Sequence, residues 1–294
     1  MIVPARRPRW PRLGASCRMG CAARMGKIMP LMAGKQGLIM GVANDRSLGW
    51  GIAKTLHAHG AQLAFTYQGE AFGKRVRPLA ESLDSDFVLD ADVTSEESLD
   101  AVFAALGRRW GRLDFVVHAI AFSDKAELTG KYLQTTRANF LKTLEISCYS
   151  FTDVCRRSAT LMPDGGSLLT LTYAGAERVM PHYNVMGVAK AALEASVRYL
   201  AVDLGNDNIR VNAISAGPVR TLASSAIGDF PYILKWNRLN SPLKRNVTTE
   251  DVGGAGLYLL SDLSAGVSGE VHHVDCGYHV VGMKAVDAPD IAVV

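Results

Sequence analysis

The chain has 294 residues, 48% of them hydrophobic and 20% charged, which is typical of a well-cored protein with one large α/β domain or two small ones. No apolar run approaches the roughly 18 residues that a membrane-spanning helix needs, so no membrane span is expected. The net charge of +4 comes from the first 28 residues, which hold seven basic residues and no acidic one. The rest has 25 basic against 28 acidic residues, which gives no electrostatic case for nucleic-acid binding.

The five cysteines do not suggest a metal site or a disulfide framework. Their number is odd, and no two of them form a Cys-x-x-Cys pair. Zinc binding, thiol catalysis and structural disulfides are therefore poorly supported, and a reducing, cytoplasmic location is expected.

Residues 1–32 form a basic extension in front of the predicted domain at 33–294. Prolines lie among arginines there without a hydrophobic period, and Arg18 and Arg24 interrupt the only apolar stretch that is a candidate secretory signal. The acid-free, Arg-rich composition also suits an organellar transit peptide. Because Met25, Met29 and Met32 offer later starts, we favour an unstructured or artefactual extension that the domain does not need.

Strand-like apolar runs alternate with helical segments along the body of the chain. The predicted strands span residues 36–42, 62–67, 87–89, 113–120, 167–171, 208–215 and 269–274. The first predicted helix begins after Gly51 and ends at residue 59. The other main predicted helices span residues 96–110, 135–162, 183–204 and 250–261. This alternation predicts a single Rossmann-like α/β domain with a doubly wound, seven-stranded parallel sheet. Residues 219–245 have weak periodicity and aromatic, Pro-interrupted content, which indicates a substrate lid with helical character.

The first strand runs into a turn that carries Gly41, Gly49 and Gly51 and then into a helix. A strand, a Gly-rich turn and a helix can cradle a phosphate, because the backbone approaches closely and helix N–H groups face the anion. The spacing is not Gly-x-Gly-x-x-Gly, so an ordinary strand-to-helix turn remains the alternative.

Polar side chains follow the second and third predicted strands. In dinucleotide-binding folds the end of the second strand meets the adenosine ribose, and here Gln68 stands there. Gln68 can hydrogen-bond ribose hydroxyls but offers no charge to a 2′-phosphate, which favours NADH over NADPH. Asp92 is placed to accept from the adenine amine, although an acid that caps the helix near Ser95 is an equally good interpretation.

The fifth strand and the helix after it carry the residues that suggest catalysis. The strand delivers Tyr173 to its end, and the helix opens near Tyr183 and carries Lys190 seven positions later. Two helical turns place Tyr183 and Lys190 on one face, where an ammonium is expected to lower the tyrosine pKa. With no candidate His or carboxylate partner, this set suits proton donation to an oxyanion better than hydrolysis. A surface Tyr and Lys on an ordinary helix is the alternative.

The segment from Asn212 to Thr221 resembles the post-strand motif of the short-chain dehydrogenases/reductases. Most of that superfamily uses Tyr-x-x-x-Lys, but Met186 lies four positions before Lys190. Tyr-x6-Lys with a second tyrosine ten residues earlier is similar to the bacterial enoyl-acyl carrier protein reductases. The resemblance runs from about residue 34 to residue 283.

The resemblance implies NADH as cofactor and assigns residues to its parts. The implied cofactor-binding residues are Gly41, Ser47 and Leu48 at the pyrophosphate, Gln68 at the adenosine ribose, Asp92 and Val93 at adenine, Ile120 at nicotinamide, Lys190 at its ribose, and Val219, Arg220, Thr221, Leu222 and Ala223 at the carboxamide and phosphates. Ser123 would approach the substrate. Tyr183 would bind the enolate oxygen, and Tyr173 would be a second proton donor, an orienting group or a pocket wall.

The implied reaction is NADH-dependent reduction of trans-2-enoyl thioesters on acyl carrier protein during fatty acid elongation, by a homotetramer. Gly228, Pro231 and Tyr232 stand where we expect basic residues that meet the acidic carrier, which makes docking through that patch doubtful. Basic residues nearby offer positive charge instead: Lys235, Arg238, Lys244 and Arg245. A reductase of other carbonyl substrates and a non-catalytic dinucleotide-binding regulator remain alternatives.

Overall fold

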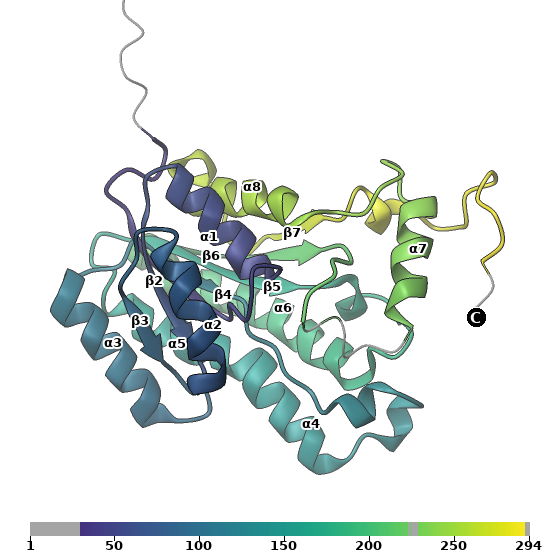
Figure 1. The fold of residues 1–294 in the computed structure, drawn as a ribbon, viewed down its shortest axis with the longest axis horizontal. Helices are drawn as coiled ribbons and strands as arrows, with labels where there is room; N and C mark the ends of the chain where they lie inside the picture. The colour runs from purple at the N-terminus through teal and green to yellow at the C-terminus, as the bar shows by residue number, and fades with distance from the viewer. Residues whose placement is uncertain (1–29, 223, 225–228, 292–294) are drawn as a thin grey trace, which may run out of the picture.

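Seven parallel strands form one sheet in the order β3-β2-β1-β4-β5-β6-β7 (Figure 1). The computed structural model describes residues 30–222, 224 and 229–291. The strands are β1 (Gln36–Met40), β2 (Gln62–Tyr67), β3 (Val88–Asp90), β4 (Phe115–His118), β5 (Gly166–Thr172), β6 (Ile209–Ala216) and β7 (Val271–Val274). The predicted fold class and all seven predicted strands are confirmed, with shifts of a few residues at their ends.

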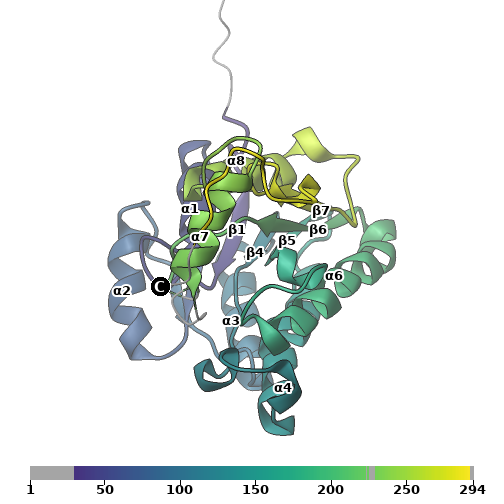
Figure 2. The ribbon, with the colours of Figure 1, turned by 90° about the vertical axis from the view of Figure 1, so that its right-hand side faces the viewer.

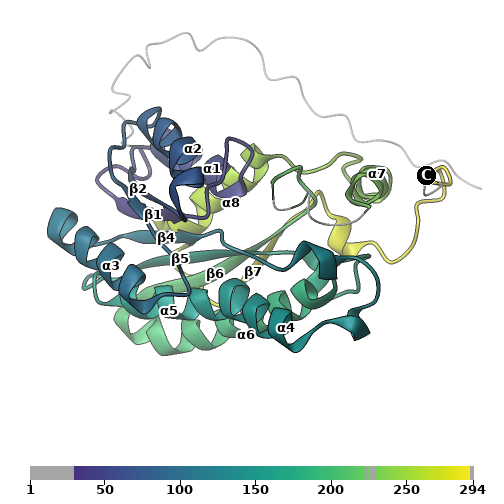
Figure 3. The ribbon, with the colours of Figure 1, turned by 60° about the horizontal axis from the view of Figure 1, so that its bottom comes forward.

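Helices cover both faces of the sheet. They are α1 (Leu48–Ala58), α2 (Glu70–Glu81), α3 (Glu96–Trp110), α4 (Arg137–Leu144), α5 (Ser150–Ala159), α6 (Asn184–Leu204), α7 (Phe230–Asn240) and α8 (Thr249–Leu260). Figure 3 shows α1, α2 and α8 on one face of the sheet and α3, α5 and α6 on the other. The described residues contain no membrane-spanning helix.

Strand β1 shows why the strands read as solid apolar runs. Leu38 and Met40 are fully buried in the core cluster that includes side chains of α3, α5 and α6. Ile39 is fully buried in the cluster on the opposite face, with side chains of α1 and α8. Because successive side chains of a strand point to opposite faces, a sheet covered on both faces needs apolar residues at every position.

Two helical segments differ from the prediction. Helix α2 was not recognised because its buried face is small, with Gly73, Val76 and Ala80, and because Pro78 lies inside it. The helix predicted over residues 135–162 consists of α4, a π-helical turn η3 (Glu145–Tyr149) and α5. Such π turns are rare and frequently occur at functional sites.

The folded part of the chain begins before residue 33. Met32 is fully buried, and its backbone N–H donates to His59 O at 2.9 Å. The boundary drawn after residue 32 is therefore too late, because Met32 belongs to the core. The rest of the predicted extension, residues 1–29, lies outside the described residues.

Helix α7 stands beyond the end of the sheet, near the last described residues (Figures 1 and 2). It begins at Phe230 with Pro231 in its first turn, where the missing proline N–H costs no helical hydrogen bond. Phe230, Ile233 and Leu234 form a small buried cluster of their own. This helix is the α-helical part of the predicted lid at about 219–245.

Candidate active site

The strand order reverses between β1 and β4, and a cavity opens at the carboxyl ends of these strands. Gly41 follows β1 with φ +90°, and a Cβ on it would lie 2.1 Å from Ala119 O. No other residue fits there, so the chain can turn tightly past the end of β4. In doubly wound sheets this switch point is where ligands bind.

The predicted phosphate-binding turn is built at this point. Ser47 Oγ accepts hydrogen bonds from the backbone N–H groups of Ala43 and Asn44, at 3.0 and 3.1 Å. Helix α1 then begins at Leu48, and both Leu48 and Gly49 line the cavity. Because the first N–H groups of a helix lack partners within it, the start of α1 offers donors to an anion.

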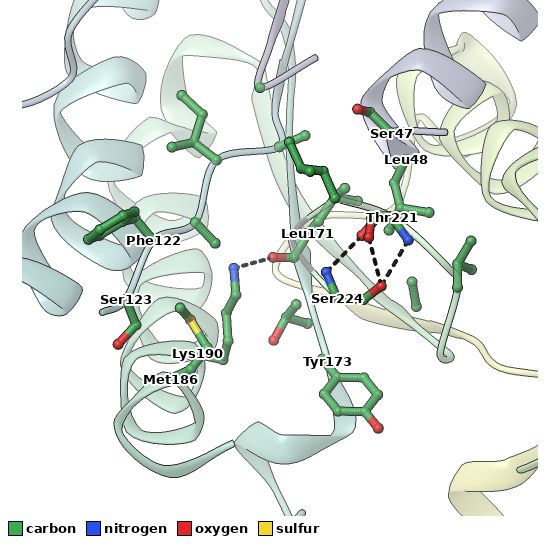
Figure 4. A pocket seen from close by; sticks show the side chains of 18 of the residues that line it. Ser47, Leu48, Phe122, Ser123, Leu171, Tyr173, Met186, Lys190, Thr221 and Ser224 are labelled. Atoms are coloured by element: carbon green, nitrogen blue, oxygen red, sulfur yellow. Dashed lines mark hydrogen bonds between the residues drawn. The ribbon is translucent and has the colours of Figure 1, made fainter. Parts of the chain in front are cut away.

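The cavity has a volume of about 630 Å³ and brings most of the predicted site residues together. These are Gly41, Ser47, Leu48, Ile120, Ser123, Tyr173, Tyr183, Lys190, Val219, Thr221 and Leu222. In Figure 4, Ser123, Met186 and Lys190 lie on one side of the cavity and Ser47, Leu48 and Thr221 on the other. Side chains from segments far apart in the sequence thus line the same cavity.

The remaining predicted cofactor residues lie outside this cavity. Gln68 and Asp92 meet at the ends of β2 and β3. Burial acts to raise the pKa of Asp92, but hydrogen bonds from Thr94 and Gln68 hold it below its ordinary value. Ser95 itself caps α3, so Asp92 organises the turn before the helix rather than the helix end.

Three further positions complete the predicted cofactor set. Val93 is partly buried against the core cluster under α3. Arg220 lines a neighbouring hollow of about 370 Å³. Ala223 lies outside the described residues.

Lys190 is buried on the second turn of α6 and faces the cavity. Its Nζ donates to Leu171 O at 2.8 Å, the bond drawn in Figure 4. An ammonium has three donors, so two remain for a ligand. Burial lowers the pKa of Lys190 to about 8.

Tyr173 and Tyr183 pack edge to face, with ring centroids 5.1 Å apart and an interplanar angle of 76°. A Cβ on Gly175 would lie 2.2 Å from Tyr183 Cδ1, so only glycine leaves room for this ring. The Tyr173 hydroxyl is buried and has no hydrogen-bond partner among the described residues. A buried donor without a protein partner is a candidate ligand contact.

The predicted effect of Lys190 on the tyrosine is wrong. Burial raises the pKa of Tyr183, and Tyr173 and Glu194 raise it further. Burial is likewise the main cause that raises the pKa of Tyr173. Tyr183 therefore stays a neutral phenol, a hydrogen-bond donor that is ready to meet developing negative charge.

A carboxylate and a histidine lie near enough to the tyrosine–lysine pair to affect its electrostatics, although neither lines the cavity. Buried Glu194 accepts from Thr172 Oγ1 at 2.7 Å. His118 is fully buried with Nε2 2.8 Å from Ser150 Oγ, and burial, with a smaller contribution from Lys190, lowers its pKa to about 3. The sequence could have revealed Glu194, because it lies one helical turn after Lys190. It could not have revealed His118, which is simply the last residue of an apolar strand.

Several cavity residues were also missed. They are Phe122, Lys125, Leu128, Met186 and Phe230, from four separate segments. Their sequence neighbourhoods carry no motif, and only the fold brings them to one cavity. Apart from Lys125 they make this part of the cavity apolar, as is usual in small-molecule pockets.

A parallel sheet with a switch-point cavity, a tyrosine that directly precedes α6 and a lysine on the second turn of that helix define a dinucleotide-dependent oxidoreductase of the short-chain dehydrogenase/reductase type. The family model described as Enoyl-(Acyl carrier protein) reductase matches residues 41–279. The chain belongs to the enoyl-acyl carrier protein reductase family, as the sequence motifs predicted.

Relatives agree over nearly the whole chain. A Rhizobium meliloti (strain 1021) protein named enoyl-acyl-carrier-protein reductase (NADH) 1 is 68% identical, over 92% of this chain and 99% of the relative. A Rickettsia typhi relative named as an NADH enoyl-acyl-carrier-protein reductase is 57% identical, over 86% of this chain and 97% of the relative. The crystal structure of the Anaplasma phagocytophilum reductase in complex with NAD has a TM-score of 0.85 and 65% identity, covering 87% of this chain and 98% of that one.

Proposed function

We propose that this chain reduces trans-2-enoyl thioesters of acyl carrier protein with NADH, and that Tyr183, Tyr173 and Lys190 carry out the protein's part of the reaction. The observation that carries the assignment is the single cavity at the β1–β4 switch point. Around it lie a neutral buried tyrosine, a second tyrosine with a free buried hydroxyl and a lysine with free donors. The proposal is also supported by the 68% identity between this chain and a relative named as an NADH enoyl-acyl-carrier-protein reductase.

The residues present fit NADH. The start of α1 offers N–H donors for the pyrophosphate at Leu48, and Lys190 has two donors left for ribose hydroxyls. The small side chains of Ala119 and Ala121 leave room beside Ile120 for the flat nicotinamide ring. When bound, NADH supplies the hydride that the β-carbon of the enoyl thioester receives.

Tyr183 acts on the thioester oxygen. As the β-carbon is reduced, negative charge gathers on this oxygen as an enolate. A phenol hydrogen-bonds this charge as it develops, and such electrostatic stabilisation usually contributes most to catalysis. Tyr173, whose hydroxyl is free in the cavity wall, orients the thioester or donates a second hydrogen bond.

The two alternatives predict different substrates. A carbonyl reductase would oxidise NADH with 3-oxo thioesters but not with 2-enoyl thioesters. A regulator would bind NADH and oxidise it with neither. We expect NADH consumption with a 2-enoyl thioester, measured by loss of absorbance of the reduced cofactor.

NADH should be preferred over NADPH. Gln68 at the end of β2 is uncharged, and Arg77 on α2 already pairs with Glu70 and lies over the Tyr67 ring. A 2′-phosphate would therefore meet no positive charge at the strand end itself unless Lys74 or Arg75 of α2 folded back on it. Hydrogen bonds to charged groups contribute about 1.5–3 kcal/mol, or roughly 10- to 100-fold in kcat/KM. The measurement is kcat/KM with each cofactor.

The Gln68→Arg variant is the control, because it should improve use of NADPH. Equal kcat/KM with the two cofactors in the parent chain would contradict the preference. NADPH use is a genuine alternative in this family, because a Bacillus cereus reductase 50% identical to this chain, with a TM-score of 0.85, was crystallised with NADP+.

We propose that the carrier docks on Lys235 and Arg238 of α7. With Arg220 they line the hollow of about 370 Å³, which shares Pro218 and Val219 with the catalytic cavity. Salt bridges from Lys235 or Arg238 to acidic side chains are absent from the described residues. Free positive charge beside the cavity suits an acidic carrier.

The other two candidates already have partners: Lys244 pairs with Asp287 and Arg245 with Asp251. A Lys235→Glu/Arg238→Glu variant should therefore raise KM for the carrier-bound substrate by about tenfold at low salt, because like charges oppose docking. KM for a short thioester without a carrier should not change. If Lys244→Glu raises KM for the carrier substrate equally, the docking site is not this hollow.

We also propose a homotetramer and a cytoplasmic location, as the sequence suggested. Large apolar side chains remain exposed along α4, η3 and α6, which supports an interface between subunits. These are Leu141, Tyr149, Tyr199 and Val202.

A further inference from the structure

Tyr183 lies between two residues with left-handed backbone conformations. His182 has φ 58° and Asn184 has φ 41°. Residues other than glycine adopt this region rarely, because Cβ crowds the backbone, although Asn and His tolerate it better than most. Such conformations persist where surrounding contacts determine them, and they cluster at functional sites.

Asn184 is held by the wall of the cavity on one side. Its Nδ2 donates to Glu127 O at 3.0 Å. Glu127 belongs to the short helix η1 (Lys125–Leu128), of which Lys125 and Leu128 line the cavity. The residue after Tyr183 is therefore fixed to one cavity wall.

His182 is held by the opposite element, the start of the lid helix. His182 Nε2 lies 3.0 Å from Asp229 Oδ2, across 47 residues of sequence. Asp229 is itself left-handed, with φ 55°, and directly precedes Phe230, which lines the cavity and begins α7. The residue before Tyr183 is therefore tied to a second wall.

The contact with Asp229 also fixes the role of each imidazole nitrogen. A carboxylate only accepts, so Nε2 carries the proton and donates to Asp229. Nδ1 is buried and has no hydrogen-bond partner among the described residues. The Asp229 carboxylate is thus the hydrogen-bond partner that the described structure gives to the His182 ring.

We propose that His182 and Asp229 are positioning residues, whose hydrogen bond fixes the left-handed turn that aims the Tyr183 hydroxyl at the substrate oxygen. The bond also joins this turn to Phe230, so the wall that meets the acyl chain and the group that stabilises the enolate are held together. The inference rests on the proposed catalytic role of Tyr183.

Glycine variants separate the bond from the backbone conformation. Glycine adopts left-handed conformations freely, so His182→Gly and Asp229→Gly remove the hydrogen bond without adding strain. Each should lower kcat about tenfold, because a small misplacement of a reacting group can reduce rate up to about 100-fold. NADH affinity should not change, since Lys190 keeps its place. The double variant should be no slower than either single variant, because both remove the same bond.

A second His–Asp pair provides the matched control. His57 Nε2 lies 3.6 Å from Asp84 Oδ2, and Asp84 is also left-handed, with φ 54°. Neither residue lines the catalytic cavity. His57→Ala and Asp84→Gly should leave kcat unchanged, and melting temperatures of all variants check that they are folded.

The proposal is overturned if His182→Gly and Asp229→Gly keep the parental kcat, as the control variants should, or if their losses multiply in the double variant. Tyr183→Phe, measured beside them, distinguishes the catalytic role of Tyr183 from the positioning role of His182 and Asp229. Parental kcat in the His182 and Asp229 variants with a large loss in Tyr183→Phe overturns the positioning role alone. Parental kcat in Tyr183→Phe overturns the proposed catalytic role and the positioning role together.

Discussion

Replacing Tyr183 by phenylalanine should lower kcat by about 10²–10³-fold, the usual effect of removing one donor aimed at developing negative charge. The variant keeps the ring, so the edge-to-face contact with Tyr173 and the packing against Gly175 remain. The lost group is the hydroxyl, and Lys190 still faces the cofactor site. NADH affinity should therefore stay close to that of the parent chain.

Burial makes this effect large. Because burial raises the pKa of Tyr183 above its ordinary value, the phenol is neutral at neutral pH and can donate. The measurement is NADH titration by fluorescence beside steady-state kinetics with a 2-enoyl thioester.

Tyr258→Phe on α8 is the matched control, because Tyr258 is 37% exposed and does not line the cavity. It should behave as the parent. Normal turnover by Tyr183→Phe would show that another group stabilises the enolate, with Tyr173 the first candidate.

The sequence predicted the features of the molecule that depend on local pattern. Alternating apolar strands and helices specify a doubly wound sheet, because each strand must bury both faces. The spacing of Tyr183 and Lys190 predicts that they share one side of α6, and both do line the same cavity. Gly41 was predicted to let the backbone approach a phosphate, whereas the structure shows that glycine is needed there to pass Ala119 O with a positive φ.

Features that depend on contacts between distant segments were not predictable. The tyrosine pKa was wrong in direction because burial outweighs a nearby charge, and burial is a property of the folded chain. The part of the cavity lining that includes Leu128, Met186 and Phe230 comes from three segments that share no motif. The π-helical turn η3 has no sequence mark, yet Ser147 within it bonds both the N–H and the carbonyl of Phe122 at 2.9 Å.

Replacing Lys190 should lower NADH affinity along with rate, unlike the change at Tyr183. Lys190→Met keeps the length of the side chain but removes two free donors from the cofactor site. Hydrogen bonds to a charged group contribute about 1.5–3 kcal/mol, so the Kd for NADH should rise roughly 10- to 100-fold. Lys190→Arg keeps the charge with a planar donor geometry and should recover only part of the affinity.

The pKa of Lys190 gives this prediction a pH dependence. Burial lowers the pKa of Lys190 from 10.5 to about 8, so the free enzyme loses the ammonium as pH rises through about 8. NADH affinity should therefore fall across that range in the parent chain. The fall should be absent in Lys190→Met, which has no charge to lose, and in Lys190→Arg, which stays charged.

Stability should move in the opposite direction to affinity. Because the folded-state pKa of Lys190 lies below its unfolded value, the buried ammonium opposes folding fully below about pH 8, and this penalty fades as pH rises from about 8 toward 10.5. At neutral pH, Lys190→Met should thus bind NADH weakly and yet melt no lower than the parent chain. Parental NADH affinity in Lys190→Met would remove Lys190 from the cofactor site. A lower melting temperature with parental affinity would make Lys190 a structural residue that holds α6 to the end of β5 through Leu171 O.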